Sequence, residues 1–320
     1  MSDDTTVRGP RRDVLISEVG PRDGLQNLDR VMATADKLAW IEGEAACGVP
    51  EIEIGSFVPP KLLPQMADTG DLLARLPDLP GTEFAVLVPN LKGAERAVAA
   101  GARKLTLTIS ASEAHSLKNV RKTPAEQVEE FKRIIRLRDG LEPGSRFELA
   151  AGVSTAFGCT LQGAVPEADV VRLAVATAQA GADEVSLADT VGYGDPAQVR
   201  RVVRAVRAEI GDLPMAGHFH DTRGLGLANV LAAYEEGVGT FDSTLGGLGG
   251  CPYAPGASGN VVTEDLVFLF ERMGVATGID LERLIALRRR VEAMLPDVTF
   301  YGHLALAGPP RDYRPAADAA

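Results

Sequence analysis

Cysteine is scarce in this chain, and the three that occur, Cys47, Cys159 and Cys251, form no Cys-x-x-Cys pair. This argues against a disulfide framework and against a thiolate zinc site. A reducing compartment fits such usage, so we expect a cytoplasmic location. The first residues, Met1-Ser2-Asp3-Asp4, are polar and acidic and resemble neither a secretion signal nor an organelle transit peptide.

Two further deficits limit the partners of the protein. No apolar run approaches the ~20 residues needed to cross a bilayer, so we expect no membrane partner. Basic residues are outnumbered, since 33 Lys and Arg against 44 Asp and Glu give a net charge of −11. This balance argues against a nucleic-acid partner, but a phosphate-bearing small molecule needs only a local basic patch.

What the chain does contain is one repeated rhythm of a short β-branched run, a loop and an amphipathic helical pattern. Strands are expected at Val14–Val19, Glu51–Phe57, Glu83–Val88, Lys104–Ile109, Phe147–Ser154, Glu184–Asp189, Met215–Asp221 and Thr240–Leu245. Helices are expected at Thr34–Cys47, Gly70–Leu76, Lys92–Ala100, Pro124–Gly140, Glu167–Ala180, Pro196–Ile210, Leu225–Glu236, Thr263–Met273 and Leu281–Leu295.

Eight such units predict an α/β fold, a (β/α)₈ TIM barrel with an additional C-terminal helical segment. An open doubly wound sheet is the alternative, but no G-x-G-x-x-G follows the first strand. We expect a disordered N-terminus over residues 1–12, the barrel over 13–296 and a C-terminal tail over 297–320. The tail should be loose from Gly308 onward, where Pro, Ala and Gly dominate.

Polar residues gather where the predicted strands end, which is where TIM barrels place their active sites. His218 and His220 should point to one face of their strand and could hold one divalent metal ion, although such a pair can also be ordinary hydrogen-bonded residues. Asp23 and Asn260 would complete a nitrogen and oxygen ligand set that suits Mg²⁺ or Mn²⁺. Asn260 is equally well placed to cap the helix that begins at Thr263.

Charged groups surround this predicted metal site. Arg22 could stabilise a developing enolate oxygen, and it could also form a structural ion pair with Glu53. Glu51 and Glu53 should share the inner face of the second strand, where a buried carboxylate needs a partner. Asp189 could orient a histidine or Arg22, or it could simply cap a loop.

Cys251 lies in the glycine-rich stretch 246–260, which predicts a loop that approaches a ligand closely and can close over it. A thiol in a dry, electropositive site can act as a general acid near neutral pH. Cys47 and Cys159 are expected to pack in the core, and His115 and His303 to lie at the surface or in the tail.

Several motifs along the chain accompany these candidate site residues. They are Glu18–Asn27, Ser56–Val58, Pro60-Lys61, Pro64–Met66, Pro89–Gly93, His218–Thr222 and the Cys251 loop. Together they resemble the hydroxymethylglutaryl-CoA lyase family, and the resemblance extends from about Val14 to Leu295. Isopropylmalate synthases share the Arg-Asp-Gly and His-x-His elements but carry extra C-terminal regions.

The resemblance implies a carbon–carbon lyase that cleaves 3-hydroxy-3-methylglutaryl-CoA to acetyl-CoA and acetoacetate by a retro-Claisen reaction. It also implies a homodimer with a role in leucine catabolism and ketone body formation. Arg22 would stabilise the enolate, Cys251 would protonate it, and the base would be His218 or a water held by Asp23. The metal ligands would be Asp23, His218, His220 and Asn260, with Glu53 and Asp189 as supporting acidic residues.

CoA would lie over the barrel mouth. Asn90, Lys92 and Lys118, with Asn119, follow the third and fourth strands and could meet its phosphates. The alternative is that these side chains belong to the solvated surface.

The chain departs from the family pattern at positions close to the predicted site. Gly152 stands where an aromatic residue is common, Ile54-Gly55 where paired threonines are common, and Arg223-Gly224-Leu225 where Tyr-Gly-Gln is usual. The changes at Gly152 and Arg223 raise the alternative of a lyase for a bulkier or differently substituted 3-hydroxyacyl-CoA. A Claisen-condensing synthase and a barrel retained only as a scaffold are further alternatives.

Overall fold

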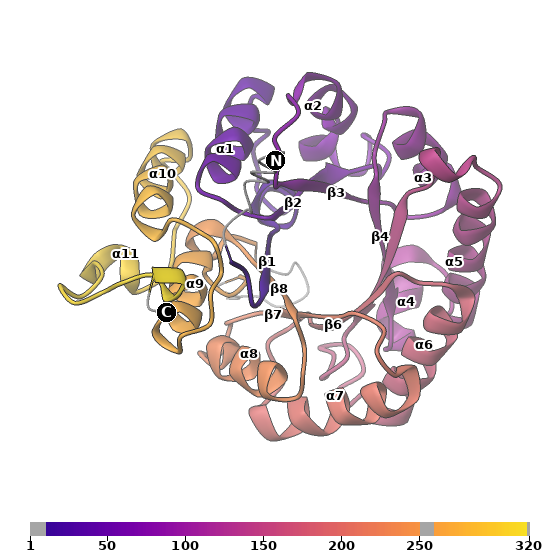
Figure 1. Cartoon of the computed structure of the whole chain (residues 1–320). Coiled ribbons are helices and arrows are strands. Elements are labelled where there is room, and N and C mark those ends of the chain that lie inside the picture. Colours follow the sequence, from indigo (N-terminus) through magenta and orange to yellow (C-terminus); the bar gives the residue numbers. More distant parts are fainter. Residues whose placement is uncertain (1–10, 250–258, 319–320) are drawn as a thin grey trace, which may run out of the picture.

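The computed structural model describes residues 11–249 and 259–318 (Figure 1). Eight parallel strands close into a barrel in chain order, with β8 paired to β1. The predicted barrel is therefore confirmed, and each strand lies within two residues of its predicted bounds. The strands are β1 (Leu15–Glu18), β2 (Glu51–Ser56), β3 (Glu83–Leu87), β4 (Lys104–Ser110), β5 (Glu148–Ser154), β6 (Glu184–Asp189), β7 (Met215–Phe219) and β8 (Thr240–Ser243).

Helices form a ring outside the strands (Figure 1). The predicted helices are α1 (Thr34–Ala46), α2 (Thr69–Arg75), α3 (Leu91–Ala99), α5 (Pro124–Asp139), α6 (Glu167–Ala180), α7 (Pro196–Ile210), α8 (Gly226–Glu235), α9 (Thr263–Arg272) and α10 (Leu281–Met294). The sequence patterns missed two helices, α4 (Glu113–Val120) and α11 (Leu304–Ala307), because both are short. Within the described ranges, no helix combines the length and the apolarity that a membrane span requires.

Local chemistry explains where the helices begin. Thr123 and Glu126 form a reciprocal capping box at the start of α5, with Pro124 at the first helical position. Asp195 caps α7 in a similar way, by accepting hydrogen bonds from the backbone amides of Ala197 and Gln198. These caps fix the starts of two of the predicted helices.

The apolar core lies between the barrel and its helices. On β4, Leu105 and Ile109 point outward and are completely buried, whereas Thr106 and Thr108 point inward and are only half-buried. Trp40 on α1 and Phe131 on α5 are also completely buried. Stability therefore comes mainly from the outer layer, which leaves the inner face of the barrel available for polar side chains.

The C-terminal segment packs against the barrel, which corrects the expected loose tail. Leu304 and Ala316 are buried, and the Tyr313 ring lies 6.0 Å from the ring of Phe268 on α9. The backbone amide of Ala316 donates a hydrogen bond to Glu271, also on α9, at 2.5 Å. Pairing with buried acceptors orders this segment in spite of its composition.

Candidate active site

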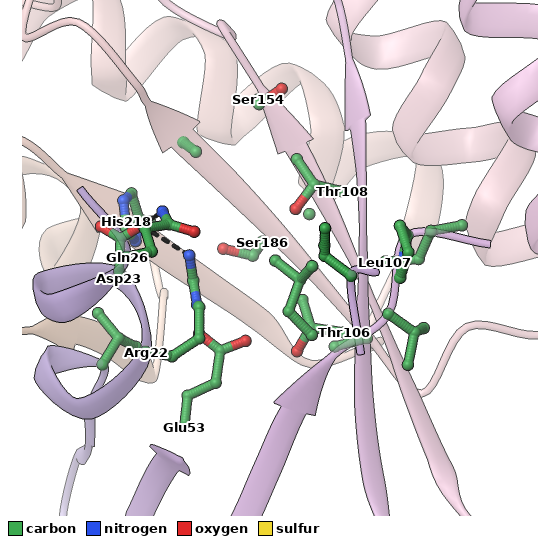
Figure 2. Close-up of a pocket in the computed structure, with 18 of the residues that line it drawn as sticks. Arg22, Asp23, Gln26, Glu53, Thr106, Leu107, Thr108, Ser154, Ser186 and His218 are labelled. Atoms are coloured by element: carbon green, nitrogen blue, oxygen red, sulfur yellow. Dashed lines mark hydrogen bonds and ion pairs between the residues drawn. The ribbon is translucent and has the colours of Figure 1, made fainter. Parts of the chain in front are cut away.

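A cavity of about 910 Å³ opens at the C-terminal ends of the strands and continues into the barrel. Figure 2 shows Arg22, Asp23 and His218 gathered on one side of it, with Thr106, Thr108 and Ser154 on the facing side. Glu53, His220 and Asp242 also line it. The barrel thus brings together residues that are more than 200 positions apart in the chain.

A π-helical turn, η1 (Gly20–Gly24), places Arg22 and Asp23 at the cavity. The amides of Arg22, Asp23 and Gly24 all donate to the carbonyl oxygen of Val19, at 3.2, 2.7 and 3.3 Å. Gly20 has no room for a side chain, since a Cβ would lie 2.5 Å from Oε1 of Glu18. Such turns are frequent at functional sites, and this one aims two adjacent charged side chains into the barrel.

The Arg22 guanidinium pairs with two carboxylates. It lies 2.5 Å from Oε2 of Glu53 and 2.6 Å from Oδ1 of Asp23. Burial raises the pKa of Glu53 to about 7, although the charge of Arg22 opposes this shift. Burial also favours a raised pKa for Asp23, but the charges of Arg22 and the two histidines outweigh it and lower the pKa of this group.

The two histidines lie side by side next to Asp23. The Nε2 atoms of His218 and His220 are 3.1 Å apart, and Nε2 of His220 lies 4.0 Å from Oδ2 of Asp23. One potential ligand atom from each of the three residues lies within 4.8 Å of the others. Neighbouring ligands on an octahedral ion with bonds of ~2.1 Å are about 3 Å apart, so the histidine spacing suits a shared ion.

Backbone pairing with β7 brings Asn260 next to the two histidines and Asp23. Asn260 forms a bridge with His220, and the amide of Val261 donates to the carbonyl oxygen of Phe219 at 3.0 Å. The Asn260 amide donates to Oδ2 of Asp23 at 2.7 Å, while its buried Oδ1 has no hydrogen-bond partner within the described part of the chain. The residue does not cap α9, which begins after Val262, so the helix-cap alternative is wrong.

This donor set fits a divalent metal ion. The orphaned Oδ1 of Asn260 and the convergent Nε2 atoms are groups that a bound cation would satisfy. Asp23 supplies the negative charge, and two imidazoles with two oxygens suit Mg²⁺ or Mn²⁺ better than a structural zinc ion.

Asp242 on β8 holds His218, and the sequence interpretation missed it. Its Oδ2 lies 3.0 Å from Nδ1 of His218, in strand register with it. Burial favours a lowered pKa for His218, but the hydrogen bond and charge of Asp242 raise it overall. Burial lowers the pKa of His220 to about 4. Inward alternation on the eighth strand was the signal that could have identified Asp242.

Asp189 caps a loop. Its two carboxylate oxygens accept hydrogen bonds from the backbone amides of Tyr193 and Gly194, at 2.9 and 3.0 Å. Arg223 lies near this loop, with its guanidinium 4.5 Å from the centre of the Tyr193 ring. Arg223 does not line the cavity that the described residues enclose, so its departure from the family pattern does not reshape that cavity.

The predicted CoA contacts separate into two groups. Asn90 and Lys118 line the cavity, whereas Lys92 is exposed on α3 and is absent from the lining formed by the described residues. Asn90 also caps α3, because its side chain accepts a hydrogen bond from the Gly93 amide. Two further cations at the end of α4, Arg121 and Lys122, line the same side of the cavity. The sequence patterns did not identify these two residues, because the short helix α4 before them was not predicted.

His115 on α4 corrects a second expectation. It is buried, and its Nδ1 lies 2.6 Å from the Ser110 hydroxyl, which lies 3.0 Å from the hydroxyl of Ser154. His303, by contrast, has the exposed side chain that was expected. The difference follows from α4, which turns His115 toward the cavity.

The cysteines differ in what the structure says of them. Cys47 and Cys159 are buried and free, as predicted. Cys251 lies outside the described residues, so its role remains a prediction. The described ends of its loop are held close together, since a Cβ added to Gly259, whose φ is +102°, would collide with the Gly247 carbonyl oxygen.

A buried carboxylate supports η1 from behind. Oε1 of Glu18 accepts hydrogen bonds from the amides of Gly20 and Leu245, both at 2.9 Å, and Oε2 accepts one from the Thr263 hydroxyl at 2.6 Å. Burial raises the pKa of Glu18 from 4.5 to about 8. This one side chain therefore ties together three segments that carry or adjoin site residues.

Comparisons with known proteins agree with this geometry. A family model described as HMGL-like matches residues 13–291. A hydroxymethylglutaryl-CoA lyase of Bacillus subtilis is 42% identical over 279 residues, which cover 87% of this chain and 92% of the relative. A 3-hydroxy-3-isohexenylglutaryl-CoA/hydroxymethylglutaryl-CoA lyase of Pseudomonas aeruginosa is 40% identical over 284 residues, covering 88% and 93%.

A solved structure gives the same result. The HMG-CoA lyase of Acinetobacter baumannii, in complex with coenzyme A and 3-methylmalate, superimposes with a TM-score of 0.87 at 42% identity. The match covers 94% of this chain and 97% of that one.

Replacing His220 with alanine should weaken Mn²⁺ binding by at least ~10-fold, because it removes one ligand from a compact set. Isothermal titration calorimetry of the purified protein measures this. His303→Ala is the matched control, since that histidine is exposed, and it should bind Mn²⁺ as the unmodified chain does. Equal affinity in the His220 variant would contradict the proposed ligand set.

Stability should fall as the pH rises from about 5 to about 8, in part because of Glu18. The folded protein keeps this carboxyl protonated to a higher pH than the unfolded chain does, so the folded state binds more protons across that window. Glu18→Gln removes this titration, and urea unfolding should show a smaller loss of stability between the two pH values. The exposed Glu129→Gln variant is the control, and an unchanged pH dependence in Glu18→Gln would refute the assignment.

Proposed function

The chain belongs to the HMGL-like family, and from this premise we propose that it is a carbon–carbon lyase that cleaves 3-hydroxy-3-methylglutaryl-CoA to acetyl-CoA and acetoacetate. One observation carries the proposal: Arg22, Asp23, His218, His220 and Asn260 converge at one end of the barrel. We assign the catalytic unit to residues 13–296. The acyl-CoA substrate class is supported by the coenzyme A complex of the Acinetobacter relative.

The reaction is a retro-Claisen cleavage. A base removes the proton of the tertiary hydroxyl, the C3 carbonyl forms, and the C2–C3 bond breaks. Its electron pair passes to the thioester as an enolate, and protonation of that enolate gives acetyl-CoA. A divalent metal, when bound, would polarise the substrate hydroxyl and carbonyl oxygens. Asp23, His218, His220 and Asn260 would hold it.

Arg22 supplies a fixed positive charge where the enolate oxygen develops. Its guanidinium is already held by Glu53 and Asp23, so no side-chain reorganisation is needed when the negative charge appears. Charge that develops only in the transition state gains most from such a cation. Glu53 therefore acts as a positioning residue for Arg22.

Protons are handled by two further groups. The base is His218 or a water held by Asp23, and Asp242 fixes the orientation of the His218 ring. Cys251 donates the proton to the enolate. Asp189 supports the site by ordering the loop that follows β6.

The alternatives differ in what they require. A condensing synthase would use the same cation and metal ligands, but it has less need of a thiol acid in the loop. A scaffold without activity would not need an orphaned Asn260 oxygen beside two convergent histidines. The homodimer, the cytoplasmic location and the role in leucine catabolism and ketone body formation remain predictions.

Purified protein should release acetyl-CoA and acetoacetate from 3-hydroxy-3-methylglutaryl-CoA when Mg²⁺ or Mn²⁺ is present. EDTA should abolish turnover, and Cys251→Ala should lower kcat by at least ~100-fold, because the proton donor is lost. Cys47→Ala is the matched cysteine control. Metal-independent turnover, or condensation of acetyl-CoA with 2-oxoacids in place of cleavage, would contradict the proposal.

Lys118→Ala should raise KM for the CoA thioester by roughly 10-fold and leave KM for a pantetheine thioester unchanged, because only CoA carries the nucleotide phosphates. Steady-state kinetics with both substrates gives the comparison. Lys92→Ala is the matched control, since Lys92 is exposed and does not line the described cavity. Equal effects of Lys118→Ala on both thioesters would exclude a phosphate contact.

A further inference from the structure

In the middle of this barrel, many of the inward positions carry small or hydroxylated side chains. TIM-barrel interiors are ordinarily packed with layers of bulky branched residues. Here the cavity continues between the strands, because the inward side chains do not fill the space. The small and hydroxylated residues that line it include Thr106, Thr108, Gly152, Ser186 and Ala188.

Burial confirms that the centre is hollow. Thr106 and Thr108 lie in the middle of β4 and face the barrel axis, yet both are only half-buried. Ala188 on β6 is half-buried in the same way. Side chains at such positions would be completely buried in a filled barrel, so a ligand can reach them from the mouth.

Gly152 widens this space without a backbone reason for being glycine. It lies on β5 between Thr108 of β4 and Ser186 of β6, in register with both. A Cβ built there would meet its nearest neighbour, the Thr108 hydroxyl, at 3.5 Å, which is an ordinary contact. Neither a left-handed φ nor crowding requires glycine at this position. The consequence of the glycine is open volume beside the site.

The floor of the space is a buried ion pair. Nζ of Lys104 lies 2.6 Å from Oε2 of Glu51, whose Oε1 accepts a hydrogen bond from Ser17 at 2.7 Å. Glu184 lines the same layer, so the floor carries two carboxyl groups and one ammonium group. The walls above it carry the hydroxyls of Thr106, Thr108 and Ser186, none of which has a side-chain hydrogen bond to another described residue. This lining disfavours an anion and offers hydrogen bonds.

The depth of the space sets the size of the group that it accepts. Lys104 and Thr108 are four residues apart on a strand that rises ~3.3 Å per residue and tilts by ~36°, so the depth is on the order of 10 Å. A chain of five or six non-hydrogen atoms fits this depth, whereas a methyl group leaves most of it empty.

We propose that the lyase prefers, over the 3-methyl compound, a substrate whose C3 substituent is an extended, uncharged chain with a hydroxyl or similar hydrogen-bonding group, which occupies the barrel interior beside Gly152. This inference rests on the proposed lyase function. The substrate carboxylate and the thioester arm stay at the cationic mouth, because the floor of the barrel offers two carboxyl groups against one ammonium group. The reacting hydroxyl remains at the ligand set of Asp23, His218 and His220.

Three CoA thioesters test this proposal: 3-hydroxy-3-methylglutaryl-CoA, its 3-(4-hydroxybutyl) analogue and its 3-pentyl analogue, which has the same length without the hydroxyl. The hydroxybutyl compound should have a kcat/KM at least tenfold above that of the methyl compound. The pentyl compound should fall below the hydroxybutyl compound, and the opposite order would overturn the polar character assigned to the chain.

Gly152→Phe fills the space and should lower the hydroxybutyl-to-methyl ratio of kcat/KM by at least tenfold. Thr108→Leu fills it from the facing strand, and its effect on the ratio should have the same sign even if the first variant folds poorly. Gly144→Phe is the matched control, because Gly144 has no neighbouring atom within 4 Å of an added Cβ. It should leave the ratio unchanged.

The outcomes separate the two proposals. Cleavage of the methyl compound alone, or a ratio unchanged by Gly152→Phe, would overturn the inference about the substituent and leave the lyase function intact. Cleavage of none of the three thioesters in the presence of Mg²⁺ or Mn²⁺ would overturn the proposed function itself.

Discussion

The Arg22 guanidinium lies between two carboxylates, Glu53 on β2 and Asp23 on its own π-helical turn, and all three groups are almost completely removed from water. Removing one partner from such a cluster leaves a buried charge uncompensated, at a cost of ~3–5 kcal/mol. The ion pairs therefore fix the turn against the barrel. Asp23 also accepts a hydrogen bond from Asn260 and faces His220. Its contacts therefore hold Arg22, the histidines and the segment around Asn260 in one fixed arrangement.

The barrel can hold this polar group because its apolar core lies elsewhere. Residues such as Leu105 and Ile109 pack under the helices, so hydrophobic burial stabilises the fold without filling the centre. The inner face is then free to carry Lys104, Glu51, Thr106 and Thr108. Side chains alternate along each strand, so the outward ones build the stable apolar layer while the inward ones line a hollow, polar interior.

Sequence reasoning succeeded wherever the signal was local. The strand and helix periods, the His-x-His face and the Arg22–Glu53 pair all follow from alternation and charge within one or two elements. It failed for His115, which was expected at the surface but is buried because it lies on the short helix α4, which was not predicted. It also failed for the segment from Gly308 on, whose composition predicted a loose tail although Tyr313 and Ala316 contact α9.

By itself, the sequence determined the eightfold β/α order and the identity of the residues that carry charge and potential metal ligands, because these depend on short-range periodicity. Only the tertiary structure decided that Asp242 holds His218, that Asn260 lies beside His220, and that Lys118 but not Lys92 lines the cavity. These relations depend on how strands pair around a closed barrel and on which way a short helix turns. No pattern within a single segment encodes the register between strands, so closure of the barrel had to supply it.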